Sequence, residues 1–389
     1  MPLKPVLAVG FLFATSSLLF GCWVAAIPGI KERFAFTDGS LGLSLLLSPL
    51  GAITGVFIST KIFSKIAVGK WMFGGYLLLC GIMILQINSV SKPMLWSCLY
   101  FFGLVSFLNG VSTNAGINLM EKKYNRLLMS SCHALYSLGG AASAGIAAAL
   151  FYVNVIPGWQ IVLLVGLIVV VLLAIRPLLI ANKEIIHSGS GIKLPSISVL
   201  GISFICMVLF MAEGCVADWS GIYFKEVLHA PDIFTSLGYG AFAVAMTIGR
   251  LNGDYLVSQT GNKKAVVAGC TLAALGFAMV VLTPFIWLSV MGYVIIGFGC
   301  SCIVPVLFRA SANIPGLSTV EGFAMVTTGG LIGFLAGPSL IGFISEKSGL
   351  SLALSLLILM TLLAALVAWR SPFLVADGLS GQQKSATSN

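Results

Sequence analysis

Long apolar runs, separated by short polar stretches, recur along the whole chain. A helix needs roughly 20 apolar residues to cross a hydrocarbon layer of about 30 Å. None of the runs alternates apolar and polar residues, as the strands of a transmembrane β-barrel do. The pattern therefore predicts an all-α membrane protein with twelve transmembrane helices. We place these helices near residues 5–28, 39–60, 71–88, 94–120, 129–155, 158–181, 198–222, 232–256, 265–284, 286–312, 319–345 and 350–370.

The longest interruption of this pattern divides the predicted helices into two sets of six. It is the stretch "ANKEIIHSGSGIKLPS" at 181–196, which combines charge, Gly/Ser and Pro. The predicted parts are an N-terminal six-helix bundle over 1–181, a cytoplasmic linker over 182–197, a C-terminal six-helix bundle over 198–370 and a cytoplasmic tail over 371–389.

The two halves share a weak internal repeat. The end of the first helix reads "GCWVAAIPGIKERF", and the end of the seventh reads "GCVADWSGIYFKEV". In each half a Gly-Cys pair precedes a Lys-Glu pair, which is Lys31-Glu32 in the first half and Lys225-Glu226 in the second. Two repeated halves, packed as pseudo-symmetric six-helix bundles, are a known plan of membrane transporters.

Composition agrees with a membrane location, and the charges indicate an orientation. The chain is 58% hydrophobic and only 8% charged, whereas about a quarter of the residues in soluble domains are charged. With the N-terminus inside, sixteen of the 21 Lys and Arg residues fall on the cytoplasmic side, as the positive-inside rule requires. This distribution of basic residues predicts that both termini are cytoplasmic. It also accounts for the net charge of +9, which therefore does not imply a nucleic-acid partner.

The segment that follows the eighth helix, "GRLNGDYLVSQTGNKK" at 249–264, predicts a gate. Glycines permit a tight turn, lysines hold the loop inside, and the acid can pair with basic groups across an inner gate. The alternative is a solvated turn that merely obeys the positive-inside rule. The stretch resembles the loop signature of the major facilitator superfamily, although the matching first-half loop, "STKIFSKIAVGKW", has neither the glycine spacing nor the acid. The expected gate residues are Gly249, Arg250, Gly253, Asp254, Gly261, Lys263 and Lys264.

Two further stretches resemble a little-characterised bacterial subgroup of that superfamily, distantly related to fucose permease. They are "NAGINLMEKKYNRLLMSSCHALYSLGG" at 114–140 and "EGCVADW" at 213–219. The resemblance implies a multi-pass protein of the bacterial plasma membrane, the inner membrane, that carries out secondary transport by alternating access. It does not identify the substrate.

Three titratable residues in the apolar segments are candidates for proton coupling. A carboxyl group at Glu213, deep in the seventh helix, could exchange a proton as its surroundings alternate between wet and dry. Asp218 lies nearer the external interface, where pairing with Lys225 is the alternative to a functional role. His133, in the fifth helix, has a suitable intrinsic pKa, but a histidine there is as readily a packing residue.

Amide, hydroxyl and aromatic side chains in the helices are candidates for solute binding. Amides can bind sugar hydroxyls, and aromatic rings can stack on sugar faces, yet asparagines also hold membrane helices together. Tryptophans favour membrane interfaces, which is the expectation for Trp219. The candidate substrate-binding residues are Asn109, Thr113, Asn114, Asn118, Tyr136 and Trp23.

The sequence thus predicts a proton-coupled secondary transporter for a small polar solute such as a sugar or polyol. A multidrug or metabolite efflux permease is the alternative. The motifs HExxH and GxSxG do not occur, so an enzyme is not expected. Because the chain has no P-loop, no CxxC pair and no Cys/His cluster, we expect neither a nucleotide-driven pump nor a cofactor or metal. The expected partners are the small-molecule substrate, protons and membrane lipids, and the protein is expected to be monomeric.

Overall fold

The computed structural model describes residues 3–124, 128–180, 199–311, 314 and 319–374. Every regular element in this part of the chain is helical, and twelve helices or broken helices are long and apolar enough to cross a membrane. The predicted all-α fold with twelve transmembrane helices is therefore confirmed. The predicted linker at 182–197 lies outside the described residues.

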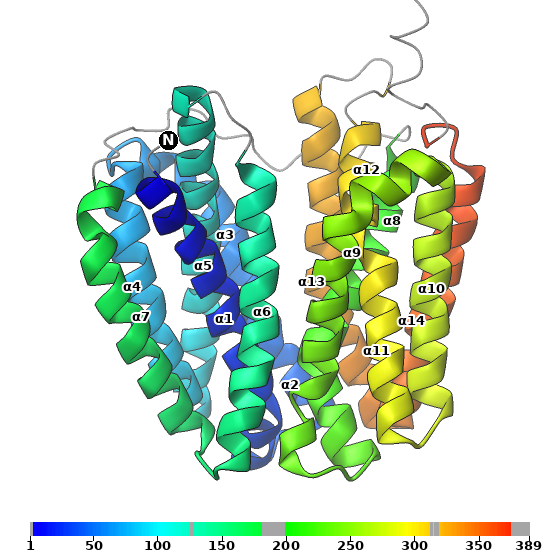
Figure 1. Ribbon diagram of the computed structural model, residues 1–389. Helices are drawn as coiled ribbons and strands as arrows, with labels where there is room; N and C mark the ends of the chain where they lie inside the picture. The colour runs from blue at the N-terminus through cyan, green and yellow to red at the C-terminus, as the bar shows by residue number, and fades with distance from the viewer. Residues whose placement is uncertain (1–2, 125–127, 181–198, 312–313, 315–318, 375–389) are drawn as a thin grey trace, which may run out of the picture.

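The first half forms six spans, which lie together on one side of the molecule (Figure 1). Their helices are α1 (Leu3–Arg33), α2 (Asp38–Leu45) with α3 (Leu47–Phe63), α4 (Val68–Ile87), α5 (Lys92–Tyr124), α6 (Met129–Tyr152) and α7 (Pro157–Ile180). We call this group the N-bundle.

The second half forms six spans on the other side, which we call the C-bundle. Its elements are α8 (Leu200–Ile222), the π-helix η1 (Tyr223–Val227), the 3₁₀ helix η2 (Asp232–Phe234), α9 (Leu237–Thr260), α10 (Asn262–Leu282), α11 (Ile286–Ser301), α12 (Ile303–Ser311), α13 (Thr319–Ser348) and α14 (Leu350–Arg370).

The helix ends define two faces of the molecule. The start of α1 and the end of α14 lie at the top of Figure 1, which we call the upper face. The end of α1 and the start of α2 lie at the bottom, which we call the lower face. The bundles meet mainly toward the lower face, where α2 packs on α13, α6 on α9 and α1 on α8.

Two spans break where continuous helices were expected, and the first helix extends beyond its expected end. The second span breaks at Leu46, and the tenth breaks at Cys302. The first helix continues to Arg33 although Pro28 lies inside it and its last residues are charged. The reason is tertiary: a side chain at Gly221 of α8 would come within 3.1 Å of the Pro28 ring, so α1 and α8 pack closely here. Lys31, one turn further along α1, forms ion pairs with Asp38 and Glu226 at the lower face.

Candidate functional site

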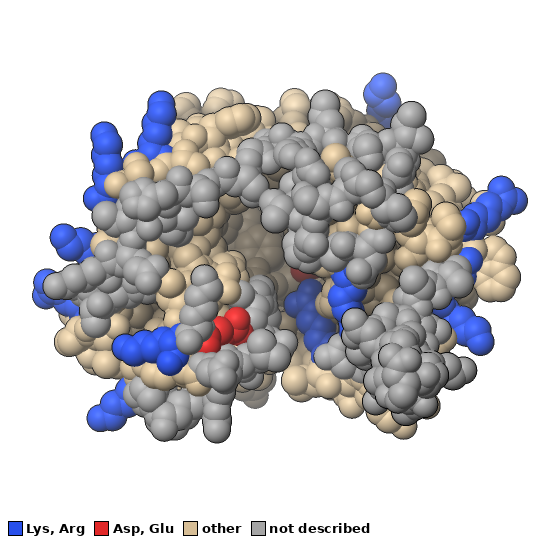
Figure 2. All heavy atoms as spheres, turned by 90° about the horizontal axis from the view of Figure 1, so that it is seen from above, with Lys and Arg blue, Asp and Glu red and all other residues tan. Residues whose placement is uncertain are grey.

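The upper face is hollowed between the two bundles. Figure 2, which looks down on this face, shows the hollow at the centre of the molecule, with acidic and basic atoms at its wall. The lower face is closed by contacts between the bundles, which are described next. The molecule is therefore in a conformation that opens to the upper face only.

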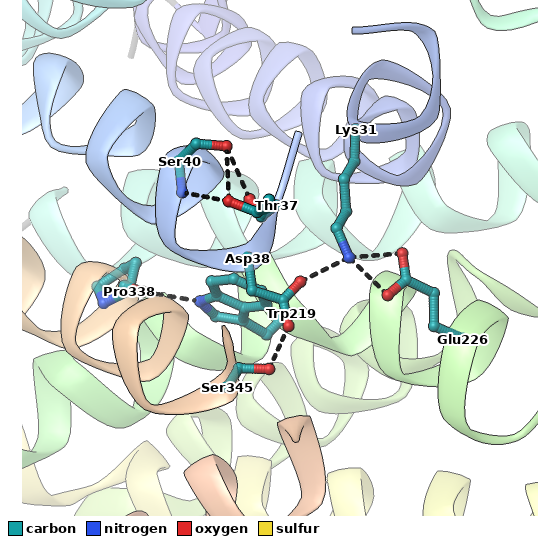
Figure 3. Close-up of polar contacts among 8 residues, drawn as sticks. All are labelled: Lys31, Thr37, Asp38, Ser40, Trp219, Glu226, Pro338 and Ser345. Atoms are coloured by element: carbon teal, nitrogen blue, oxygen red, sulfur yellow. Dashed lines mark hydrogen bonds and ion pairs between the residues drawn. The ribbon is translucent and has the colours of Figure 1, made fainter. Parts of the chain in front are cut away.

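The lower face is closed first by ion pairs at Lys31, the last turn of α1. Its ammonium group lies 2.5 Å from an oxygen of Asp38 at the start of α2 and 2.5 Å from an oxygen of Glu226 in η1 (Figure 3). Asp38 also accepts a hydrogen bond from the Ser345 hydroxyl of α13. One lysine therefore joins three elements, two in the N-bundle and one in the C-bundle, and Asp38 extends the network to a fourth.

A second ion pair mirrors the first. Lys225 in η1 lies 2.7 Å from an oxygen of Glu32 at the end of α1, and 3.6 Å from Asp232. The Lys-Glu pairs of the internal repeat therefore exchange partners: Lys31 binds Glu226, and Lys225 binds Glu32. The alternative of pairing Asp218 with Lys225 is wrong, because Lys225 turns toward Glu32 and Asp232.

Close backbone approach of α2 and α13 completes the closure. A Cβ added at Gly342 would lie 2.6 Å from the Asp38 carbonyl oxygen and 3.1 Å from Gly42 Cα. The Ser339 hydroxyl donates a hydrogen bond to the Gly42 carbonyl oxygen at 2.9 Å. Small residues at these positions allow the helices to touch, as is typical of membrane helix pairs.

Trp219 lies within this closure rather than at a membrane interface. Its side chain is fully buried, and its indole N–H donates to the Pro338 carbonyl oxygen at 3.0 Å (Figure 3). The expectation of an interface anchor is therefore wrong. The signal for interface anchoring was position near a helix end, and it could not reveal that α13 covers this side of α8.

A polar cluster lies between the bundles, further from the lower face. Glu213 of α8 and Arg250 of α9 are close enough for their charges to interact, and both interact with the Tyr136 phenol of α6. The Arg250 guanidinium donates to the Ser137 hydroxyl, 3.1 Å away on α6. Tyr239 of α9 also interacts with both charged groups. We call Tyr136, Ser137, Glu213, Tyr239 and Arg250 the central cluster.

Helix α1 adds two serines beside the central cluster. The Ser17 hydroxyl lies within hydrogen-bonding reach of the Tyr136 and Tyr239 phenols. The neighbouring Ser16 hydroxyl is 2.7 Å from the Tyr76 hydroxyl of α4. Sequence reasoning found Glu213, Arg250 and the face of α6 that carries Tyr136 and Ser137, but it missed Ser17 and Tyr239. Serines and tyrosines are common in membrane helices, so only their convergence distinguishes these two.

The four polar residues predicted on α5 fall into two groups. Asn109 is fully buried, where its amide accepts from the Trp71 indole at 3.1 Å and donates to the Gly75 carbonyl oxygen at 3.2 Å. Thr113 is buried too and donates to the Asn109 carbonyl oxygen at 2.7 Å. The Asn109 contacts hold α5 against α4, where Thr113 also reaches the Tyr76 phenol. We therefore correct the expectation of substrate contact for this pair: in this conformation they are structural.

Asn114 and Asn118 occupy another face of α5. A Cβ added at Gly110, one turn before Asn114, would meet no atom within 4 Å, so this face borders open space. The Asn114 amide nitrogen donates to the Gly110 carbonyl oxygen at 2.8 Å, and Asn118 is exposed. Trp23 is 3% exposed in this conformation and lies in the core.

The structure describes the glycines and lysines of the expected gate but not every acidic or histidine side chain. The side chains of Asp254 and His133 lie outside the described residues. Gly261 joins α9 to α10 with φ 79°, a backbone conformation that favours glycine, and Lys263 and Lys264 follow in the first turn of α10. Gly249 and Gly253 face the break between α11 and α12, where an added Cβ at Gly253 would lie 2.9 Å from the Cys302 sulfur.

Comparisons with known proteins identify relatives of this chain. A family profile described as Major Facilitator Superfamily matches residues 7–320. An uncharacterised MFS-type transporter of Yersinia pestis is 31% identical over 358 residues, which cover 91% of this chain and 92% of the relative.

Solved structures share the fold at low sequence identity. A D-xylose-proton symporter has a TM-score of 0.72 at 15% identity, covering 95% of this chain and 98% of its own. A bacterial homologue of the human lysosomal transporter Spinster, in an inward-facing and unoccupied conformation, has a TM-score of 0.71 at 12% identity, covering 96% and 98%.

Proposed function

Because the chain belongs to the Major Facilitator Superfamily of membrane transporters, we propose that it is a secondary active transporter of a small polar solute, coupled to protons. The observation that carries this proposal is a polar cluster between two bundles that are closed on one face and open on the other. A solute that reaches the central cluster from the upper face would leave through the lower face once its ion pairs separate.

The distribution of charge supports placing the upper face in the cytoplasm. Sixteen of the 21 basic residues were assigned to the side of the N-terminus, and the start of α1 lies at the upper face. Figure 2 shows Lys and Arg side chains around that face. In this orientation the conformation is open to the inside, and the pair formed by Lys31 and Glu226 belongs to the outer gate.

The central cluster supports a polar solute rather than a cationic drug. Its phenol and hydroxyl groups, with the Asn114 amide on α5, can exchange hydrogen bonds with a hydroxylated solute such as a sugar or polyol. Arg250 places a positive charge beside Glu213, so the cluster presents no net negative charge that would attract a cation. The name of the D-xylose-proton symporter is in line with this class of solute.

Glu213 is our candidate for the proton-carrying group. It is the acid of the central cluster, and it comes from α8, which packs against the N-bundle helix α1 as well as against α9 and α13. Movement of the bundles would therefore change the hydration of this carboxyl group and its proton affinity.

Transport by the purified protein in proteoliposomes tests the proposal. We expect exchange of one sugar or polyol from a panel without a pH gradient, and its accumulation when the outside is more acidic. The same panel should include cationic drugs. Transport of a cationic drug but of no sugar or polyol would favour an efflux permease. Transport of no solute at all would contradict a transporter for small polar solutes.

A further inference from the structure

The central cluster contains a cation whose hydrogen-bonding capacity is mostly unused. Arg250 lies ten residues before the end of α9, so it is roughly 15 Å from the upper end of that helix. Within the part of the chain that the structure describes, its guanidinium group makes one hydrogen bond, to the Ser137 hydroxyl. A guanidinium group carries five N–H donors. Most of these donors are therefore available to a ligand that enters the hollow.

Glu213 lies near Arg250 but forms no close ion pair with it. Their charges interact, but no ion pair within 4 Å joins them among the described residues. Among the described side chains, the other titratable groups that interact with Glu213 are two phenols and two thiols, which are neutral near pH 7. They are Tyr136 of α6, Tyr239 of α9, Cys206 of α8 and Cys300 of α11.

The charge of the cluster therefore depends on one proton. With Glu213 ionised, its negative charge balances Arg250. With Glu213 protonated, Arg250 is left as a positive charge in a site between membrane helices, which is unfavourable unless an anion compensates for it. A carboxylate fits this requirement, because its two oxygens match the fork of guanidinium N–H groups.

We propose that the transported solute carries a carboxylate group, which binds Arg250 when Glu213 is protonated. A solute with one carboxylate and the proton on Glu213 then cross the membrane together with no net charge. After the solute leaves, Glu213 releases its proton to water, and its negative charge again balances that of Arg250. This inference deepens the proposed function and rests on it for the role of Glu213. A hydroxylated acid would satisfy both the guanidinium group and the neighbouring phenol and serine hydroxyls.

Ligand binding to the purified protein tests the carboxylate directly. The probes are D-glucuronate, L-lactate and succinate, each measured beside its neutral amide by thermal stabilisation at pH 5.5 and pH 8. We expect at least one carboxylate to bind more than tenfold tighter than its amide, and more tightly at pH 5.5. Equal binding of acid and amide, or stabilisation by none of the carboxylates, would overturn the proposal.

Two substitutions give opposite expected results. Arg250→Gln should weaken carboxylate binding more than tenfold, whereas Arg370→Gln, at the exposed end of α14, should leave it unchanged. Glu213→Gln should strengthen carboxylate binding at pH 8 about tenfold and remove its pH dependence. Misfolding cannot produce such a gain, so unchanged binding by Glu213→Gln at pH 8 would count against the proposal.

Proton movement separates this proposal from the proposed function. A pH-sensitive dye inside proteoliposomes reports proton entry when a probe is added outside. Proton entry driven by a neutral amide but not by its acid would support proton-coupled transport and would contradict the proposal that the solute carries a carboxylate group. Binding of the acid with no proton entry would support the Arg250 site and contradict proton coupling.

Discussion

The Lys31 ammonium group lies 2.5 Å from a carboxylate oxygen of Glu226, although 195 positions separate the two residues. The repeat partners Lys225 and Glu32 lie 2.7 Å apart. Each Lys-Glu pair thus binds its counterpart in the other half, as residues related by a pseudo-two-fold axis do. The internal repeat has therefore become a reciprocal clasp across the lower face.

The two arms of this clasp should differ in strength. The Lys31 side chain is 10% exposed, and its loss would leave the Asp38 and Glu226 carboxylates together without a cation. Lys31→Met should therefore destabilise the closed lower face by about 1–2 kcal/mol, roughly a 5- to 30-fold change in population. Distances between spin labels on the lower ends of α1 and α9 would measure the opening.

Lys225→Met is the matched control. Its partner Glu32 is 73% exposed, and exposed pairs contribute about 0–1 kcal/mol. Exchange of the charges in Lys31→Glu with Glu226→Lys should restore most of the closure. If Lys225→Met opened the lower face as much as Lys31→Met, the buried arm would not be the stronger one.

A bulky side chain at the α2 and α13 contact should prevent closure. Gly342→Leu would force its side chain against the Asp38 carbonyl oxygen and the Gly42 backbone. We expect the lower face to open and cysteines placed in the hollow to become reactive from that side. Gly166→Leu in α7 is the control, because an added Cβ there meets no atom within 4 Å. Equal behaviour of the two variants would exclude a role of this contact in closure.

Glu213→Gln should separate exchange from proton-driven accumulation. Glutamine keeps the size and the hydrogen bonding of the side chain but cannot release a proton. We expect counterflow of the solute to persist while accumulation on a pH gradient is lost. Uptake into proteoliposomes with and without that gradient measures both. Continued accumulation would make Glu213 structural and move the coupling role to Asp218 or His133.

Substitution by alanine should have different effects at two asparagines of α5. Asn109→Ala would leave the Trp71 N–H and the Gly75 carbonyl group without their partner, at a cost of about 1–3 kcal/mol in stability. Asn114→Ala should weaken solute binding with little change in the melting temperature, because the hydrogen bond that this side chain makes, to the Gly110 carbonyl oxygen, lies within its own helix. Unfolding of Asn114→Ala with normal residual affinity would assign this residue to helix packing instead.

Tags at the two ends test the orientation. We expect both the N-terminal and the C-terminal tag to be protected in spheroplasts, whose outer membrane is opened, and accessible in inverted membrane vesicles. A tag at either end that is accessible in spheroplasts would be periplasmic and would contradict the assignment of the upper face to the cytoplasm.

Hydropathy alone determined the helical architecture of this protein, because the cost of placing a segment in a bilayer is close to a sum over its own residues. The twelve spans, the division into two halves and the repeated Lys-Glu pairs were all readable from the chain. The helix breaks at Leu46 and Cys302 were not predicted: Pro49 and Pro305 stand three residues after them, but a proline does not by itself decide a break, because Pro28 and Pro338 lie inside continuous helices.

Only the tertiary structure decided which polar residues meet. Asn109 and Asn114 look alike in sequence, but five residues turn a helix by about 140°, so one faces α4 and the other faces open space. Arg250 looked like part of a gate until its side chain was seen to reach Ser137 of the other bundle, beside Glu213. The rotation of each helix and its distant neighbours set these contacts, and no local stretch of sequence contains that information.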